Sequence, residues 1–432
     1  MFLKRFQLGL IHLAVAMTLV PINSTLNRVM IKELAISATL VSLLAALPYI
    51  FSPLQLAIGS YSDRHPVFGF RRSPYILLGL LLCVAGVMAA PQVAFLMARS
   101  PALGIFSAGL AFGAWGMGYN LSSVSYLALA SELSGEKGRG KTIATMWFMM
   151  IISIIFTAIA ISRMVEPYSP AALQKAFSVI GLAALILGGL GLLRLESRFS
   201  AEKTGPGENF SLREMANVIL KSPQATLFFW YLTLLLAAIL GQDVLLEPFA
   251  AEAFGWSVQQ TTRLTSLWGV SVLLAILLAG GLERFAPRKT VAQAGNLAAL
   301  GGFLVILFSG LGGAEKLFSG GVILLGVGTG LSTVANLALM FDLTLPGFVG
   351  LFIGAWGVAN SLSRLLGTLL AGIVRDLAAA LTGNAPLAYA LVFGLEAAML
   401  TLAIFLLTRL NAERFQRQTL PPSPLERAAL SE

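Results

Sequence analysis

The sequence predicts an all-α membrane protein with twelve transmembrane helices in two pseudo-symmetric six-helix halves. Its 432 residues are 57% hydrophobic and only 11% charged, and the mean hydropathy is +0.84. Such a chain has too little charge to cover the surface of a water-soluble protein of this length. The apolar residues gather in runs of about 20, the length at which a helix crosses the hydrocarbon of a bilayer. Features of the first half also return in the second half, which indicates a duplication.

Twelve apolar runs account for most of the chain. Several contain glycine or proline, which membrane helices tolerate when neighbouring helices satisfy the backbone. The first run follows Lys4 and Arg5 and loosely resembles a secretory signal, but it continues to about Leu26, so we interpret it as a membrane helix. The predicted spans are 6–27, 38–61, 73–91, 101–130, 142–163, 172–194, 223–243, 262–282, 290–312, 318–341, 347–375 and 387–408.

Lysine and arginine are distributed unevenly among the connections. Most of them lie in one set of alternate connections, which includes both termini, and few lie in the other set. Because positively charged loops tend to stay in the cytoplasm, we expect both termini to be cytoplasmic. The net charge of +9 is therefore interpreted as a topology signal, and no nucleic-acid partner is expected.

The longest polar connection divides the chain. It contains the flexible stretch Glu202–Glu208, and Phe210–Lys221 has the composition of an amphipathic helix lying on the membrane. The expected organisation is an N-terminal six-helix half, a cytoplasmic linker, a C-terminal six-helix half and a cytoplasmic tail. These parts cover 1–194, 195–222, 223–408 and 409–432.

A polar island at Gly59–Tyr75 separates the second and third runs, and a shorter version returns at Gly281–Lys289. The island predicts a cytoplasmic charge latch, in which a carboxylate at a helix end pairs with arginines of the loop. The alternative is simple anchoring by positive charge. The candidate latch or gating residues are Asp63, Arg64, Arg71, Arg72, Glu283 and Arg284.

Charged side chains within the runs are functional candidates, because burying them in hydrocarbon is costly. Asp342 is a candidate partner of Arg364, while Glu132 and Asp342 are also explained as helix-end charges at the cytoplasmic interface. No clustered pair of intramembrane carboxylates is evident, so the sequence indicates no proton relay. The candidates are Arg28, Glu132, Asp243, Glu247, Asp342 and Arg364.

His12 is the only histidine at membrane depth. Its imidazole is able either to ligate the magnesium of a chlorin or to donate to a backbone carbonyl. With two histidines and one cysteine in the chain, no protein metal site is expected, and no nucleotide or hydrolase motif points to an enzyme. The asparagines within the runs are candidates for pigment binding or for interhelical hydrogen bonds. They are Asn23, Asn27, Asn120, Asn336 and Asn360.

Several longer strings resemble the PucC family, also called the bacteriochlorophyll-delivery family, a branch of the major facilitator superfamily. The loop at Gly59–Arg72 is also similar to the superfamily signature G-x-x-x-D-R-x-G-R-R, with His65–Phe68 as an insertion. The strings that carry the resemblance are Thr25–Leu34, Ala46–Pro53, Gly69–Ile76, Asp342–Thr344, Gly350–Gly357, Arg364–Thr368 and Val374–Asp376.

The resemblance implies a major facilitator fold and a role in assembling photosynthetic complexes. It implies chlorophyll or bacteriochlorophyll as the bound pigment, light-harvesting or photosystem subunits and chlorophyll-synthesis enzymes as partners, and a thylakoid, inner or intracytoplasmic membrane as the location. Gln55 stands where purple-bacterial members are expected to have a basic residue, which favours a cyanobacterial branch. The alternative function is a secondary active transporter of a small solute, with Asp243 and Glu247 as the coupling carboxylates.

Overall fold

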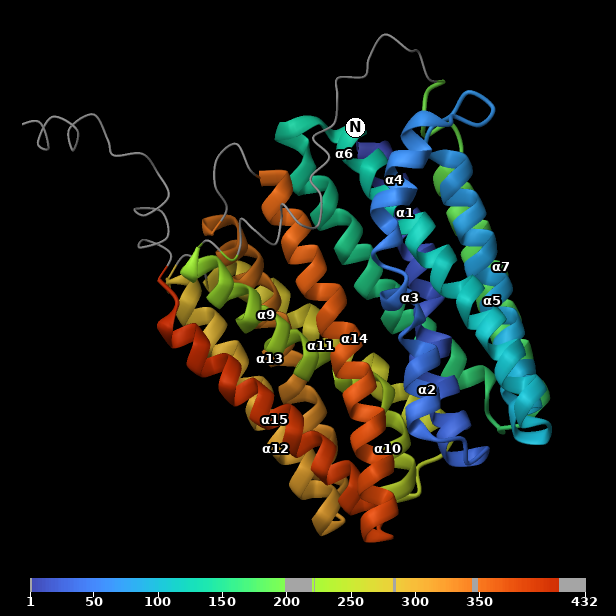
Figure 1. Ribbon diagram of the computed structural model, residues 1–432, viewed down its shortest axis with the longest axis vertical. Coiled ribbons are helices and arrows are strands. Elements are labelled where there is room, and N and C mark those ends of the chain that lie inside the picture. The colour runs from blue at the N-terminus through green and yellow to red at the C-terminus, as the bar shows by residue number, and fades with distance from the viewer. Residues whose placement is uncertain (1, 199–219, 221, 283–284, 344–348, 412–432) are drawn as a thin grey trace, which may run out of the picture.

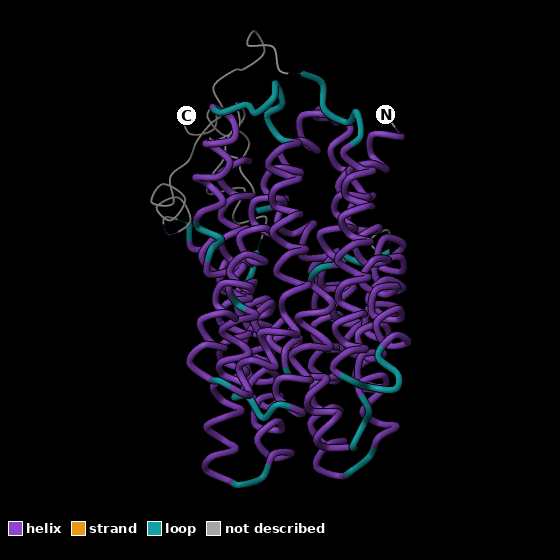
Figure 2. The backbone as a smooth tube through the Cα atoms, turned by 90° about the vertical axis from the view of Figure 1, so that its right-hand side faces the viewer, coloured by secondary structure: helices purple, strands orange, loops and turns teal. Residues whose placement is uncertain are grey.

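The computed structural model describes residues 2–198, 220, 222–282, 285–343 and 349–411 of the chain. Regular structure in these residues is helical, apart from one isolated bridge between Val67 and Phe70. The helices run side by side along the long axis, and the loops gather at its two ends (Figures 1 and 2). Within the described residues, eleven helices are long and apolar enough to cross a membrane. The prediction of an all-helical membrane fold is therefore confirmed.

The first bundle contains all the helices before residue 193. Its most extensive contacts join α5 to α6, α1 to α6 and α1 to α7. Its helices are α1 (Phe2–Met17), η1 (Pro21–Leu26), η2 (Val29–Glu33), α2 (Ala38–Ala45), α3 (Leu47–Ile50), α4 (Leu54–Arg64), α5 (Ser73–Arg99), α6 (Pro101–Met164) and α7 (Pro170–Leu192).

The second bundle contains the helices after residue 222, and its pairs α12–α13, α11–α13 and α9–α14 pack most extensively. Its helices are α9 (Pro223–Gly241), η4 (Gln242–Val244), α10 (Leu246–Phe254), α11 (Val258–Leu282), α12 (Arg288–Gly312), α13 (Glu315–Asp342), α14 (Val349–Thr382) and α15 (Ala385–Arg409).

Two predicted spans differ from the structure in continuity. The run 38–61 is divided into α2, α3 and α4, because Pro48 lies in the first turn of α3 and Pro53 directly precedes α4. The runs 101–130 and 142–163 belong instead to the single element α6, which changes direction at Gly135, where φ is 60° and ψ is 173°. Only glycine adopts that backbone conformation at little cost.

The first and seventh crossings are broken at corresponding places. After α1 the backbone widens into the π-helices η1 and η2, and after α9 it tightens into the 3₁₀ turn η4 before α10 begins. Interrupted helices in matching positions of two repeats often mark the binding region of a transporter-like fold. The breaks bring Ser24 of η1 and Glu247 of α10 together.

Close helix contacts at small residues also repeat between the bundles. A β-carbon added to Gly118 of α6 would lie 2.5 Å from the carbonyl oxygen of Gly79 in α5. A β-carbon on Gly328 of α13 would lie 2.6 Å from the carbonyl oxygen of Gly295 in α12. In both pairs the backbones approach as closely as glycine alone permits, the contact that membrane helices favour.

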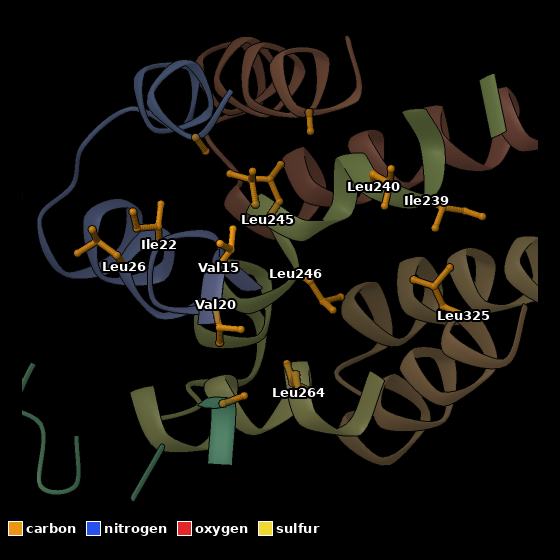
Figure 3. Close-up of a cluster of buried hydrophobic side chains, with 14 of the residues drawn as sticks. Val15, Val20, Ile22, Leu26, Ile239, Leu240, Leu245, Leu246, Leu264 and Leu325 are labelled. Atoms are coloured by element: carbon orange, nitrogen blue, oxygen red, sulfur yellow. The ribbon is translucent and has the colours of Figure 1, made fainter. Parts of the chain in front are cut away.

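An apolar cluster joins the two bundles beside the breaks (Figure 3). Val20 follows α1 on the side of the first bundle, while Leu246 of α10 and Leu264 of α11 face it from the second. All three side chains are buried. The core therefore continues from one bundle into the other at this level.

We call the end of the molecule that carries the N-terminus the N-face and the opposite end the distal face (Figure 1). The predicted linker helix at Phe210–Lys221 and the tail after residue 411 fall outside the described residues, apart from Leu220. The predicted domain boundaries therefore stay predictions.

Candidate functional site: polar contacts between the bundles

Asp376 of α14 joins the second bundle to the first near the distal face. Its carboxylate accepts hydrogen bonds from the backbone amides of Ala38 (3.1 Å) and Thr39 (2.8 Å), and from the hydroxyl of Thr39 (2.8 Å). These amides begin α2 and have no partner within that helix. A carboxylate at a helix N-terminus is also favoured by the helix dipole. We call this contact the distal clasp.

Arg375 and Glu252 support the clasp from within the second bundle. The guanidinium of Arg375 donates to Asp376 at 3.1 Å and to Glu252 of α10 at 3.0 Å, and it lies over the ring of Tyr389. Charge-assisted hydrogen bonds of this kind fix the direction of a carboxylate. Contacts within the second bundle thus orient the carboxylate of Asp376 toward α2.

The broken first helix makes three further contacts with the second bundle. Ser24 donates to Glu247, which also accepts from Thr265 at 2.8 Å. The hydroxyls of Thr25 and Thr262 lie 3.1 Å apart, and Arg28 donates to the carbonyl of Trp256 at 3.1 Å while pairing with Glu33. Arg28 and Glu247 therefore hold the bundles together, a role that the sequence did not suggest.

Arg364 lies at the centre of the contact between the bundles. It donates to the hydroxyl of Tyr49 of α3 at 3.2 Å, with its guanidinium 5.4 Å from the centre of that ring. The acidic group that acts on it electrostatically is Asp243 of η4. The expected pairing of Arg364 with Asp342 is therefore wrong. Asp342 ends α13 at the N-face and pairs there with Arg288.

Asp243 has a second carboxyl group as a neighbour. Glu396 of α15 is 3% exposed, and neither of its carboxylate oxygens has a hydrogen-bond partner among the described residues. Asp243 acts on it electrostatically, while Gln242 donates to Asp243 at 2.7 Å. The expectation that no intramembrane carboxylates cluster is therefore wrong.

The charge latch at the N-face differs in its partners from the expected one. Arg72 is 5% exposed and donates to Glu132 of α6 at 2.9 and 3.1 Å, and to Ser62 at 2.7 Å. Arg288 and Asp342 form the corresponding pair in the second bundle. Glu132 and Asp342 are thus helix-end charges that bind arginines within their own bundles. The side chain of Asp63 and the whole of Glu283 and Arg284 lie outside the described residues, while Arg64 is exposed.

Glu196, just after α7, holds the polar island to the first bundle. Its carboxylate accepts from the backbone amides of Arg71 (2.9 Å), Arg72 (3.1 Å) and Ser73 (2.7 Å). These amides begin α5, so Glu196 stabilises the start of that helix as Asp376 stabilises α2.

His12 lies in the first bundle, apart from the contacts between the bundles. Its ring centre is 5.1 Å from that of Tyr126 and 6.2 Å from that of Trp147. The Nδ1 atom is buried without a hydrogen-bond partner among the described residues. An unused nitrogen beside two aromatic rings fits the donor that a magnesium chlorin needs.

The candidate asparagines do not form one site. Asn120 donates to the carbonyls of Pro48 (2.7 Å) and Gly116 (2.8 Å) and accepts from Gln55. Asn336 accepts from Tyr231 at 2.7 Å, Asn27 donates to the carbonyl of Asn23, and Asn360 is exposed. Asn120 and Asn336 thus connect helices, as the structural alternative predicted.

The roles of Glu396, Tyr49, Asp376 and Glu196 were not predicted from the sequence. Glu396 had a clear signal, because it is the only charged residue in the apolar run 387–408. Asp376 and Glu196 stand at helix ends, where acidic residues are common. Only the packing of distant helices identifies the amides that they bind.

A family model described as "PUCC protein" matches residues 25–415. The chain belongs to the PUCC family. Among its relatives, "Protein PucC" of Rhodobacter capsulatus is 31% identical over 93% of this chain and 90% of its own length. The "Bacteriochlorophyll synthase 44.5 kDa chain" of Rhodobacter capsulatus is 29% identical over 96% of both chains. The relatives come from purple phototrophic bacteria and do not support the expected cyanobacterial branch.

Solved transporter structures share the fold of this PUCC family member. A point mutant of the nucleoside transporter NupG aligns with a TM-score of 0.74 and 15% identity over 94% of this chain and 99% of its own. An inward-facing bacterial homologue of the human lysosomal transporter Spinster aligns with a TM-score of 0.71 and 12% identity, covering 98% and 99%. The likeness identifies a major facilitator-type fold, and the chain is a multi-pass membrane protein.

Proposed function

We propose that this protein is a photosynthetic assembly factor that binds chlorophyll or bacteriochlorophyll and delivers it to light-harvesting or photosystem proteins. The observation that carries the proposal is membership of the PUCC family over residues 25–415. The name of one relative, a bacteriochlorophyll synthase chain, associates that protein with the same pigment. In this proposal the chain is not itself an enzyme and acts by binding pigment and client proteins, with chlorophyll-synthesis enzymes as further partners.

His12 is the residue that we propose to hold the pigment. A bound chlorin would bring a magnesium ion, which could accept a neutral nitrogen ligand. The unpartnered Nδ1 of His12 provides that nitrogen, and Tyr126 and Trp147 provide aromatic surface near it. This assignment also accounts for a buried imidazole nitrogen that otherwise lacks a hydrogen bond.

We also propose that the N-face is cytoplasmic, so that pigment is handled on the side where clients are made. The positively charged connections support this orientation. Several hydrogen bonds between the bundles lie from the middle of the molecule to the distal face: those of Ser24, Thr25, Arg28, Ala38, Thr39, Arg364 and Ser266. These hydrogen bonds join the two bundles on the side that we propose to be the outer one.

The decisive experiment is to purify the protein in mild detergent from its phototrophic host and to record its visible spectrum and its co-purifying subunits. Stoichiometric pigment together with antenna or photosystem proteins supports the proposal. His12→Ala is expected to lower the bound pigment, and His65→Ala provides the matched control, because His65 is exposed in the polar island. Equal pigment in both variants would remove His12 from the proposal.

The second candidate function is secondary active transport of a small solute. The group of Asp243, Arg364 and Glu396 at the contact between the bundles favours it, as does the likeness to transporter structures. Accumulation of a labelled solute by colourless protein in proteoliposomes would support transport and reject the assembly role.

A further inference from the structure

Glu396 lies halfway along α15 in an apolar environment without the partners that a buried carboxylate requires. It is 3% exposed, and both of its oxygens lack a hydrogen-bond donor among the described residues. An ionised carboxylate in such surroundings is strongly destabilising unless it is paired or neutralised. The fold therefore places at this point a group that needs a ligand.

The carboxyl group of Glu396 points toward the place where α9 and α14 cross. Its Oε1 atom is 2.9 Å from the position that a β-carbon on Gly241 would occupy, and the carbonyl oxygen of Gly367 is 3.0 Å from that same position. Both neighbours are glycines, so the close space that holds the carboxyl group is built from backbone. A larger side chain at residue 241 would fill it.

Asp243, two residues beyond Gly241, provides the second acid of the group. Its charge acts on Glu396, and Arg364 of α14 is the cation that acts on it. Gln242 donates to Asp243, while its own amide oxygen is buried without a donor among the described residues. Asp243 thus has a second carboxyl group on one side and a guanidinium on the other, and an unused amide acceptor lies on the adjacent residue.

Tyr49 extends the group into the first bundle. Arg364 contacts its hydroxyl and its ring, and Tyr119 of α6 lies close enough to interact electrostatically with the same arginine. The titratable and charged groups that face one another are therefore Glu396 from α15, Asp243 from η4, Arg364 from α14, Tyr49 from α3 and Tyr119 from α6. A change of charge on Asp243 therefore acts directly on the arginine that joins the bundles, and Glu396 acts on Asp243.

We infer that Asp243 and Glu396 form a proton-binding site whose occupancy controls how firmly Arg364 holds Tyr49 and the first bundle. One proton added to the two carboxylates leaves one negative charge against one guanidinium, which makes the group neutral. The protonated carboxyl also becomes a donor and can satisfy an acceptor such as Gln242. Release of the proton leaves an excess negative charge that draws Arg364 away from Tyr49.

A proton fits this site better than a metal ion. No set of three or more histidine, cysteine, aspartate or glutamate side chains among the described residues is arranged to hold a metal. Alkali and alkaline-earth cations also need several oxygen ligands, whereas a proton needs only one acceptor. The inference does not depend on which pigment, client or solute the protein handles.

The proton site can be tested by infrared spectroscopy on the full chain in lipid nanodiscs, without pigment. We expect an absorption band of a protonated carboxylic acid at neutral pH that disappears in Glu396→Gln, and labelling of Glu396 by dicyclohexylcarbodiimide that decreases as the pH rises. Glu252→Gln is the matched control, because Glu252 is ion-paired with Arg375 at 3.0 Å and should contribute no such band. If Glu396→Gln does not fold, Asp243→Asn serves as the second variant.

Absence of the band from the wild-type protein would overturn the inference, as would its persistence in both Glu396→Gln and Asp243→Asn.

The coupling of the proton site to the two bundles is measured by the distance between spin labels on Arg64→Cys and Phe285→Cys, two exposed positions at the N-face. We expect the distance distribution to change with pH in the wild-type background and to lose that response in Glu396→Gln. An unchanged pH response in Glu396→Gln would reject the coupling. Loss of pigment binding in His12→Ala would affect neither measurement.

Discussion

The carboxylate of Asp376 accepts a hydrogen bond of 2.8 Å from the backbone amide of Thr39, so a side chain of one bundle caps the first turn of a helix in the other. Caps of this kind are usually made within a helix or a loop. Here the cap couples the integrity of α2 to the closure of the two bundles. Opening the distal face requires the first two amides of α2 to lose their acceptor, while Ser37 still caps Leu40 within the first bundle.

The distal clasp predicts the effect of Asp376→Ala. Loss of the cap should weaken closure by about 1–3 kcal/mol, which corresponds to an increase of roughly 5–150-fold in the open population. The measurement is the rate at which a maleimide modifies Thr262→Cys, a position that is fully buried beside Thr25.

Glu315→Ala is the control for the clasp. Glu315 also lies near the distal face, but its carboxylate accepts from Trp256 within the second bundle. Its removal should leave the maleimide rate unchanged. Equal rates in Asp376→Ala and the parent protein would show that the cap does not hold the face closed.

The crossing of α9 and α14 predicts a large effect from a single methyl group. A β-carbon on Gly367 would overlap the carbonyl oxygen of Ala237, so Gly367→Ala must separate the two helices. We expect a loss of about 1–3 kcal/mol, the usual result of overpacking. The measurement is the thermal unfolding midpoint in detergent.

Gly357→Ala is a matched control on the same helix. A β-carbon there would contact nothing within 4 Å, and alanine favours a helix over glycine by up to about 1 kcal/mol. The two variants should therefore shift the midpoint in opposite directions. A similar shift in both would mean that helix propensity, and not the crossing, determines the response.

The repeated arginine–carboxylate pairs at the N-face should differ in strength. A double-mutant cycle on Arg72→Gln and Glu132→Gln should give a coupling energy of about 1 kcal/mol, because the buried Arg72 donates two hydrogen bonds to Glu132, although Glu132 itself is 42% exposed. The same cycle on Arg288→Gln and Asp342→Asn should give about 0.2–1 kcal/mol, because both side chains are partly exposed. The reverse order of the two couplings would contradict the assignment of Arg72 as the stronger latch.

Arg364→Gln should be strongly destabilising, by about 3–5 kcal/mol, because it leaves Asp243 in the membrane without its cation. Adding Asp243→Asn should restore much of the loss, since it removes the uncompensated charge. Unfolding midpoints of the two single variants and the double variant provide the measurement. A double variant that is as unstable as the sum of the single changes would show that the two groups act independently.

The sequence was sufficient to predict the membrane class, eleven of the spans and the duplication, because each depends on a local run of apolar residues or on a repeated string. It did not predict the division of 38–61 into three helices, although Pro48 and Pro53 provided the reason. A span defined by hydropathy alone carries no information on continuity.

The site was less predictable than the fold. Arg364 and Asp243 were recognised as intramembrane charges, but the partner assigned to Arg364 was wrong, because Asp342 lies at the N-face and pairs with Arg288. Which acid meets which base depends on the depth and rotation of each helix. A single sequence specifies neither.

Glu196 fixes the chain that leaves the first bundle to the start of α5. The residue lies a few positions before the end of the described first bundle, and its carboxylate is fixed to the amides that begin α5. A protein that engages the chain after residue 198 would pull first on α5, and through Arg72 on Glu132 at the turn of α6. Residue 196 is therefore bound to the N-face of the first bundle, so a force applied beyond residue 198 would act on that bundle through Glu196.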